Sequence, residues 1–326
     1  MQVPPYPLRL IPTFRNYLWG GRKLASHLSK PIPSDGVWAE SWEVVDHAEH
    51  ESVIANGPLA GQTLGGLMRS DSQWLVGDAP TVAGRFPLLL KYLDCQRVLS
   101  VQVHPEDEYA LAMEPPDLGK TEAWYIVDAE PGSILYAGLK PGVERHDLLE
   151  AIEVGQTADC LHAMEPKVGD CVFIPAGTVH ALGAGLIVAE IQQASNTTFR
   201  LYDWDRVDDQ GYSRPLHIEQ SLETINFSSG PRQWQTPRPL AEPGRERLVE
   251  CDKFLFDRIR GISQIKLGGD GRFHILTVPA GRAQVTLGAS APIETLRTGE
   301  SLLLPASHAA VEILLGKDTT VLEASI

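Results

Sequence analysis

Short runs of β-branched and aromatic residues, separated by glycine and proline turns, are the feature that most constrains the fold of this chain. The run Thr121 to Ala129 precedes a Pro-Gly turn and then the run Ser133 to Leu139, which predicts a hairpin. The pattern continues through Leu161 to Glu165, Cys171 to Pro175 and Val179 to Leu182. Glycine occurs 29 times and proline 24 times in 326 residues. Closely spaced short strands with turns between them are typical of an all-β sandwich or barrel.

Helical patterns are few. Glu144 to Val154 places Leu148 and Ile152 on one face, and Arg214 to Ile225 carries Pro215 at a position that a first helical turn tolerates. The sequence therefore predicts an all-β chain with a few short helices.

One eight-residue block occurs twice. Gly169 to Ala176 aligns with Gly299 to Ala306, since each has a glycine, an acid, an apolar run and Pro-Ala. A polar, proline-rich stretch from Gly230 to Arg247 lies between the copies. The repetition predicts two related barrels, a first domain over residues 1–244 and a second over residues 245–326.

Side chains suited to metal binding come from three segments. Alternate residues of a strand share a face, so Gln102 and His104 are expected to point the same way, as are Lys120 and Glu122. His180 follows a tight turn further along. Two histidines and one glutamate are a ligand set that catalytic zinc uses. The pattern predicts a metalloenzyme.

The second copy of the repeat lacks counterparts of Gln102, His104 and Glu122. We therefore expect the second barrel to be degenerate and metal-free. His308, near its repeated block, is interpreted as a structural or surface residue.

Charge and composition restrict the partners. The formal net charge is −14 and the pI is near 5.1, which argues against nucleic acid and anionic membrane surfaces. No apolar run is long enough to span a bilayer, and no secretory signal is recognisable, so a cytoplasmic protein is expected. A small molecule is the expected partner. Four cysteines, without a C-x-x-C pair, are predicted to be buried thiols: Cys95, Cys160, Cys171 and Cys251.

Several longer motifs resemble a known family, the type I mannose-6-phosphate isomerases of the cupin superfamily, particularly its short bacterial members. The matching motifs span residues 16–220 in order: N-Y-L-W-G-G (16–21), E-S-W-E (40–43), F-P-L-L-L-K (86–91), S-V-Q-V-H-P (100–105), G-K-T-E-A-W-Y (119–125), I-P-A-G-T-V-H-A-L (174–182), A-E-I-Q-Q (189–193) and N-T-T-F-R-L-Y-D-W-D-R (196–206). The resemblance implies a bicupin of double-stranded β-helix (jelly-roll) barrels.

The same resemblance implies an activity and its residues. The activity would be the interconversion of mannose 6-phosphate and fructose 6-phosphate by proton transfer through an enediol, in a monomer or homodimer. One Zn²⁺ per chain would bind to Gln102, His104, Glu122 and His180. Arg200 and Lys120 would be catalytic. Ser100, Lys91 and Trp19 are the expected substrate-binding residues.

The catalytic base is left open. Many members of the family that the chain resembles have Asp where this chain has Asn196, and an amide is not a proton acceptor of the carboxylate kind. Lys120, a histidine, a metal-bound water, Glu40 or Glu43 would then take this role. The alternative for Lys120 is that it pairs with Glu122 or the substrate phosphate and transfers no proton.

Arg200 would stabilise the enediolate or hold phosphate, or else form an ion pair with Asp203 or Asp205.

His47 and His50 are interpreted as solvated surface residues.

Two other functions compete. A cupin Fe(II) dioxygenase also uses two histidines and a carboxylate, but such enzymes have H-x-H where this chain has Gln102-Val103-His104. A non-catalytic sugar-binding bicupin is the third hypothesis, and Lys120 and Arg200 argue against it.

Overall fold

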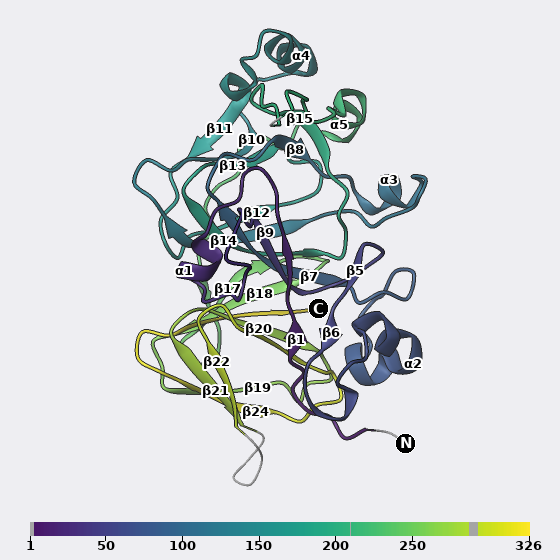
Figure 1. Cartoon of the computed structure of the whole chain (residues 1–326), viewed down its shortest axis with the longest axis vertical. Coiled ribbons are helices and arrows are strands. Elements are labelled where there is room, and N and C mark those ends of the chain that lie inside the picture. Colours follow the sequence, from purple (N-terminus) through teal and green to yellow (C-terminus); the bar gives the residue numbers. More distant parts are fainter. Residues whose placement is uncertain (1–2, 209, 287–292) are drawn as a thin grey trace.

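Two β-sandwiches are stacked along the long axis of the molecule, the first in purple, blue and teal and the second in green and yellow (Figure 1). The computed structural model describes residues 3–208, 210–286 and 293–326. The first sandwich has a six-stranded sheet in the order β12-β9-β14-β7-β3-β2 and a five-stranded sheet in the order β11-β10-β13-β8-β15. The strands are β2 (Thr13–Arg15), β3 (Glu40–Val44), β7 (Leu88–Cys95), β8 (Val101–Val103), β9 (Glu122–Ala129), β10 (Leu135–Leu139), β11 (Leu161–Met164), β12 (Cys171–Ile174), β13 (His180–Leu182), β14 (Leu186–Gln193) and β15 (Phe199–Tyr202).

The second sandwich repeats this arrangement. Its six-stranded sheet runs β16-β17-β18-β25-β20-β23, and its four-stranded sheet runs β19-β24-β21-β22. The strands are β16 (Arg238–Pro239), β17 (Arg245–Glu250), β18 (Leu255–Arg260), β19 (Gln264–Leu267), β20 (His274–Ala280), β21 (Arg282–Thr286), β22 (Glu294–Arg297), β23 (Ser301–Leu304), β24 (Val311–Leu315) and β25 (Thr320–Ser325). When the six strands of each large sheet are numbered by their position along the chain, both sheets have the same strand order, 1-2-3-6-4-5.

The duplicated sequence block has the same structural position in both halves. Gly169 leads into β12 and Gly299 into β23, and each strand forms an edge of its large sheet. Both glycines have positive φ, 93° and 84°, in the region that disfavours side chains. The predicted all-β jelly-roll fold is confirmed, and the division between residues 244 and 245 stays a prediction.

One predicted hairpin is wrong. The runs at β9 and β10 lie in different sheets, so the turn around Gly132 carries the chain across the sandwich. Alternation marks both runs as strands but does not say which neighbour each one pairs with.

The helices are short and lie at the periphery. The predicted helix at 144–154 is found as α4 (Arg145–Glu153), whereas α5 (Ile218–Thr224) begins after Pro215, later than expected. A longer helix, α2 (Leu64–Val76), was missed, and its first turn is capped by the Thr63 hydroxyl, which accepts from the Gly66 amide. The remaining short elements are α1 (Lys23–Ser26), α3 (Asp107–Leu111), β1 (Leu10–Ile11), β4 (Asp46–His47), β5 (His50–Glu51) and β6 (Val53–Ile54).

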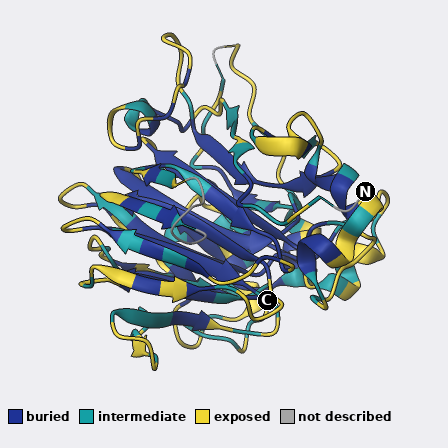
Figure 2. Ribbon diagram, turned by 90° about the horizontal axis from the view of Figure 1, so that it is seen from below, coloured by how far each residue is buried: buried dark blue, intermediate teal, exposed yellow. Residues whose placement is uncertain are grey.

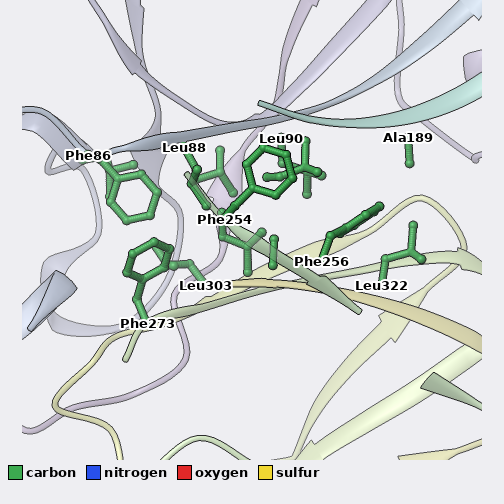
Figure 3. Close-up of a cluster of buried hydrophobic side chains, with 14 of the residues drawn as sticks. Phe86, Leu88, Leu90, Ala189, Phe254, Phe256, Phe273, Leu303 and Leu322 are labelled. Atoms are coloured by element: carbon green, nitrogen blue, oxygen red, sulfur yellow. The ribbon is translucent and has the colours of Figure 1, made fainter. Parts of the chain in front are cut away.

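A continuous apolar layer joins the two sandwiches. Leu88 and Leu90 of β7 face Phe254, Phe256 and other apolar side chains of the second sandwich (Figure 3). The central strands of the two large sheets, β7 and β14 in the first and β20 and β25 in the second, are almost entirely buried and form the dark blue centre of Figure 2. Because neighbouring residues alternate in direction, Lys91 of β7 and Glu190 of β14 point to the opposite side, into the first sandwich.

Burial of the cysteines is nearly as expected. Cys95, Cys160 and Cys171 are buried, but Cys251 is only partly buried, so the prediction fails for this thiol. Within the part of the chain that the structure describes, no helix is both long and apolar enough to cross a membrane.

Candidate metal centre

Three predicted ligands converge inside the first sandwich. His104 directly follows β8, Glu122 is the first residue of β9, and His180 is the first residue of β13. Register pairing of His180 with Gln102 brings β13 and β8 together at this point. One candidate ligand atom from each of His104, Glu122 and His180 lies within 4.8 Å of the others, and all three side chains are buried.

The two histidines are oriented as neutral ligands. The Nδ1 of His104 donates to the Thr197 carbonyl at 2.9 Å, and the Nδ1 of His180 donates to the Thr178 carbonyl at 2.8 Å. Their Nε2 atoms therefore carry the lone pair and face Glu122. Burial and the nearby Lys120 ammonium hold the pKa of His104 well below its usual range and lower the pKa of His180 to about 3.

The Glu122 carboxylate lacks sufficient partners. Both oxygens are buried without a well-formed hydrogen bond, although the Lys120 Nζ lies 2.9 Å from Oε2. The Nε2 atoms of His180 and His104 lie 3.4 and 3.7 Å from this carboxylate. Burial, followed by the neighbouring Glu190 carboxylate, raises the pKa of Glu122. The Lys120 Nζ contacts only one of the two oxygens, and two imidazole lone pairs also face this buried carboxylate, so these donors fit a divalent metal.

Gln102 lies at the same place but its amide is turned. Its Nε2 is 3.2 Å from the His180 Nε2, and its oxygen accepts from the Ser100 hydroxyl at 3.4 Å. Rotation of the amide by half a turn would bring the oxygen toward the histidines. Its role as a ligand stays a prediction.

Lys120 is placed by a close approach of two backbone segments. A Cβ on Gly119 would lie 2.5 Å from the Asp107 amide nitrogen, so only glycine fits there. The Lys120 amide then donates to the Pro105 carbonyl, and its Nζ reaches the His104 Nε2 at 2.9 Å. Lys120 thus lies between the predicted ligands and the adjoining cavity.

A cavity of about 270 Å³ opens beside the cluster. Every predicted catalytic and substrate-binding residue lines it: Trp19, Lys91, Ser100, Lys120 and Arg200, together with Gln102. Sequence reasoning missed Tyr17, Glu190 and Arg214, which also line it. Glu190 is the single acid of β14 and follows four apolar residues, which is a usable signal. Arg214 lies in the loop before α5, and the helical pattern predicted to begin there does not indicate a role in the site.

A buried charge network forms one wall of the cavity. The Lys91 Nζ lies 3.0 Å from Glu190 Oε1 and 3.8 Å from Glu40 Oε2. Indole N–H groups of Trp124 and Trp42 donate to Glu190 and Glu40 at 2.9 and 2.6 Å. Burial opposes the charge on Lys91, but the two carboxylates raise its pKa above the ordinary value. Glu43, the other acid considered as a base, instead contacts Lys30 at 2.5 Å and does not line the cavity.

The opposite wall carries arginines. Arg200 donates from Nη1 to the Pro215 carbonyl at 2.9 Å, and its Nε is buried without a hydrogen-bond partner. Arg214 makes two hydrogen bonds to Asp203, at 2.8 and 2.6 Å. Arg206 also pairs with Asp203. Asp203 therefore pairs with Arg206 and Arg214, the described structure shows no ion pair between Arg200 and Asp203 or Asp205, and Arg200 lines the cavity.

Two of the remaining histidines differ in outcome. The surface interpretation of His47 is wrong, since it is buried and its Nε2 lies 3.2 Å from the Asp117 carboxylate. His308 is buried in the second sandwich, where its Nδ1 donates to the Ala309 carbonyl at 2.5 Å, as a structural histidine would.

Comparisons with known proteins identify the family and the fold of this chain. A family model described as phosphomannose isomerase type I, catalytic domain, matches residues 8–128. The mannose-6-phosphate isomerase of Streptococcus mutans is 36% identical over 92% of both chains, and the mannose-6-phosphate isomerase ManA of Bacillus subtilis is 36% identical over 92% of this chain and 93% of its own. A crystal structure of the mannose 6-phosphate isomerase from Bacillus subtilis superposes with a TM-score of 0.89 at 30% identity, covering 98% of this chain and 99% of the other. The predicted cupin-type fold is thus confirmed, and the chain belongs to the type I mannose-6-phosphate isomerase family.

Proposed function

We propose that this chain interconverts mannose 6-phosphate and fructose 6-phosphate with one bound Zn²⁺. The observation that carries the proposal is the under-satisfied Glu122 carboxylate between two neutral histidines, directly beside a cavity with basic residues. Family membership supplies the substrate class, because the relatives are named for this sugar phosphate.

Zinc is favoured by the donors. His104, His180, Glu122 and the Gln102 amide oxygen would hold it, and nitrogen and oxygen donors without a redox requirement suit this ion. When bound, the ion would polarise the sugar carbonyl and orient the neighbouring oxygens as a Lewis acid.

Arginines at the far wall fit the phosphate. Arg200, whose Nε has no partner, presents a guanidinium fork that can pair with phosphate oxygens, and Arg214, whose Nε and Nη2 are bonded to Asp203, adds positive charge on the same cavity. Ser100, Lys91 and Trp19 line the same cavity as the arginines, and they would contact the sugar hydroxyls.

Lys120 is the proposed proton carrier. The neutral Nζ amine of Lys120, which a bound cation would favour, can accept a proton. The aldose loses the C2 proton to this amine, the C–H electron pair forms the C1–C2 double bond, and the carbonyl π pair moves onto O1. A proton then moves from the C2 hydroxyl to O1, the C2 carbonyl forms, and the double-bond pair takes the proton back from Nζ at C1 to give the ketose. Glu40 and Glu190 each hold an indole N–H and face Lys91, and Glu43 lies outside the cavity. Lys120 is the group that contacts both the ligand cluster and the cavity.

The competing functions have less support. Family membership favours an isomerase over an Fe(II) dioxygenase or a non-catalytic sugar-binding bicupin. Asn196 lines the cavity, but its side chain donates to Glu49 at 3.0 Å, which suits a structural role and leaves the proton transfer to another group. A cytoplasmic location and a monomeric or dimeric state remain predictions.

A coupled assay tests the proposal. Purified protein should convert mannose 6-phosphate to fructose 6-phosphate, lose the activity after chelation, and regain it with one equivalent of zinc. Full turnover by protein shown to be metal-free would contradict the proposal.

A further inference from the structure

The Asp117 carboxylate, which lies outside the cavity lining, collects an unusual number of hydrogen-bond donors. Its Oδ1 faces the His47 Nε2 at 3.2 Å and the Arg85 Nη1 at 3.4 Å. Its Oδ2 accepts from three groups of one short segment: the Ser195 hydroxyl at 3.0 Å, the backbone N–H of Asn196 at 3.2 Å and the Thr197 hydroxyl at 2.8 Å. The side chain is only 12% exposed. A carboxylate that accepts hydrogen bonds from five donors is held rigidly, and it restrains the groups that donate to it.

The segment bound by Asp117 is the one that orients a predicted metal ligand. The Thr197 carbonyl accepts the Nδ1–H of His104 at 2.9 Å. This bond sets the tautomer and the ring direction, so that Nε2 faces Glu122. Asp117 is therefore two contacts away from His104, through the hydroxyl and then the carbonyl of the same threonine.

The same segment also forms part of the cavity wall. Asn196 and Thr198 line the cavity, between β14 and β15. On the other side, the buried Gln192 amide donates to the Ser195 carbonyl at 2.7 Å. Residues 195–198 thus have no backbone strand partner to hold them, and side chains fix them from two directions.

We infer that Asp117 is a positioning residue for the metal centre, which fixes His104 by holding residues 195–197 in place. This inference rests on the proposed metal site. The inference explains why Asp117 and its partners His47 and Arg85 lie beside residues 195–197, whose Thr197 carbonyl orients His104. Burial opposes the charge, but the hydrogen bonds from His47 and Thr197 hold the pKa of Asp117 well below its usual range.

Zinc affinity measured in competition with a chromophoric chelator tests the inference, without reference to turnover. Asp117→Asn keeps one carbonyl oxygen and therefore leaves some donors without an acceptor. We expect its zinc dissociation constant to rise about tenfold, the lower end of the range for groups behind a ligand. Thr197→Val, which removes only the hydroxyl bond, should show a smaller rise, and Thr197→Ser should restore the wild-type value.

Asp94→Asn is the matched control. Asp94 is another buried carboxylate, it accepts the Lys23 backbone amide at 2.6 Å, and it lies on the outer face of β7 away from the ligands. This variant should lose thermal stability while its zinc affinity stays within twofold of wild type.

Three outcomes are decisive. If Asp117→Asn and Thr197→Val bind zinc as tightly as wild type, the inference is overturned. If Asp94→Asn weakens zinc as much as Asp117→Asn, the effect is general loss of stability and the positioning role is refuted. If the wild-type protein itself binds no zinc, the proposed function is contradicted. This result is distinct from equal zinc binding by wild type and all variants, which contradicts only the positioning role of Asp117. Should Asp117→Asn not fold, Thr197→Val carries the same test.

Discussion

The two sandwiches share their strand order but not their interiors. Their registers correspond residue by residue: Glu122 stands opposite Ile174, and His274 stands opposite Leu304 in the second copy. Glu190 pairs with Lys91 in the first sandwich. Glu323 pairs with Asp257 at the same place in the second. Even the bulge in the pairing of β3 with β7 recurs between β17 and β18.

Charge balance separates the two interiors. The first has three carboxylates (Glu40, Glu122, Glu190) against two ammonium groups (Lys91, Lys120), which leaves a formal charge of −1 beside a cavity. The second has two buried acids (Asp257 and Glu323) and the exposed Asp270 at its rim against Arg245, Arg247 and His274, and this group is neutral when the histidine is protonated.

Contacts in the second interior are close. Arg245 lies 2.7 Å from Asp257 and 2.9 Å from Glu323, and His274 lies 2.7 Å from Glu323. Guanidinium forks satisfy these carboxylates without an added ion. One fold therefore gives a candidate metal site where the charges are incomplete, and an internally paired ionic core where they are complete.

The largest expected effect comes from removing a ligand in the first sandwich. His104→Ala should lower kcat/KM by at least about a thousandfold, because the loss of a Lewis acid removes several kcal/mol of transition-state stabilisation. Bound zinc, measured by elemental analysis, should fall in parallel. His308→Ala in the second sandwich should retain near-normal turnover and metal content, and equal loss in both variants would break the comparison.

Proton transfer by Lys120 gives the next effect. Lys120→Met should lower kcat by at least about a hundredfold, the lower range for loss of a general acid-base group, with zinc content unchanged. Steady-state kinetics and metal analysis on the same preparation check this. A variant with near-wild-type kcat would leave Lys120 as a binding residue.

Phosphate binding predicts a smaller effect in a different parameter. Arg214→Gln should raise KM for mannose 6-phosphate about tenfold, since a charge-assisted pair contributes about 1.5–3 kcal/mol, while kcat changes little. Arg258→Gln, which removes a guanidinium that pairs with Glu246 outside the first cavity, is the matched control. A KM unchanged by Arg214→Gln would remove this residue from the phosphate site.

The last prediction concerns the pH dependence of stability in the second interior and expects no effect on catalysis. Burial opposes the charge, but Asp270 and Glu323 raise the pKa of His274 to about 9. Its stabilisation is therefore complete below the unfolded pKa near 6.5 and is lost as the pH rises through about 9, a change of at most about 3 kcal/mol. Melting temperatures from pH 6 to 10 should fall more steeply for wild type than for His274→Gln, with kcat unaffected.

His308→Gln provides the control for that experiment. His308 is also buried, but burial lowers its pKa and no acid pairs with it among the described residues. Its charge therefore contributes no stabilisation that is lost as the pH rises, so the variant should keep the wild-type slope. Equal slopes for wild type and His274→Gln would show that the paired histidine does not stabilise the second sandwich.

Much of the candidate site could be predicted because its signals are local. Strand alternation places Gln102 with His104 and Lys120 with Glu122, and family motifs add His180. The structure brings these residues together around one cavity. The repeated Gly-to-Pro block also predicted the duplicated fold.

Other features depend on contacts that leave no local pattern. The pairing of His47 with Asp117 joins residues 70 positions apart, and Asp117 reaches Thr197 across 80. The hairpin at 121–139 was wrong because the alternation of a strand is the same whichever sheet it enters. The ionic interior of the second sandwich was missed for the same reason, since its acids and arginines lie on separate strands.

Anomalous diffraction at the zinc edge, from crystals of zinc-loaded protein, tests the central claim most directly. The account predicts a single strong peak per chain in the first sandwich, bonded to His104, Glu122 and His180, and none at His274 and Glu323. A peak of comparable height in the second interior, or none between the three predicted ligands, would contradict it.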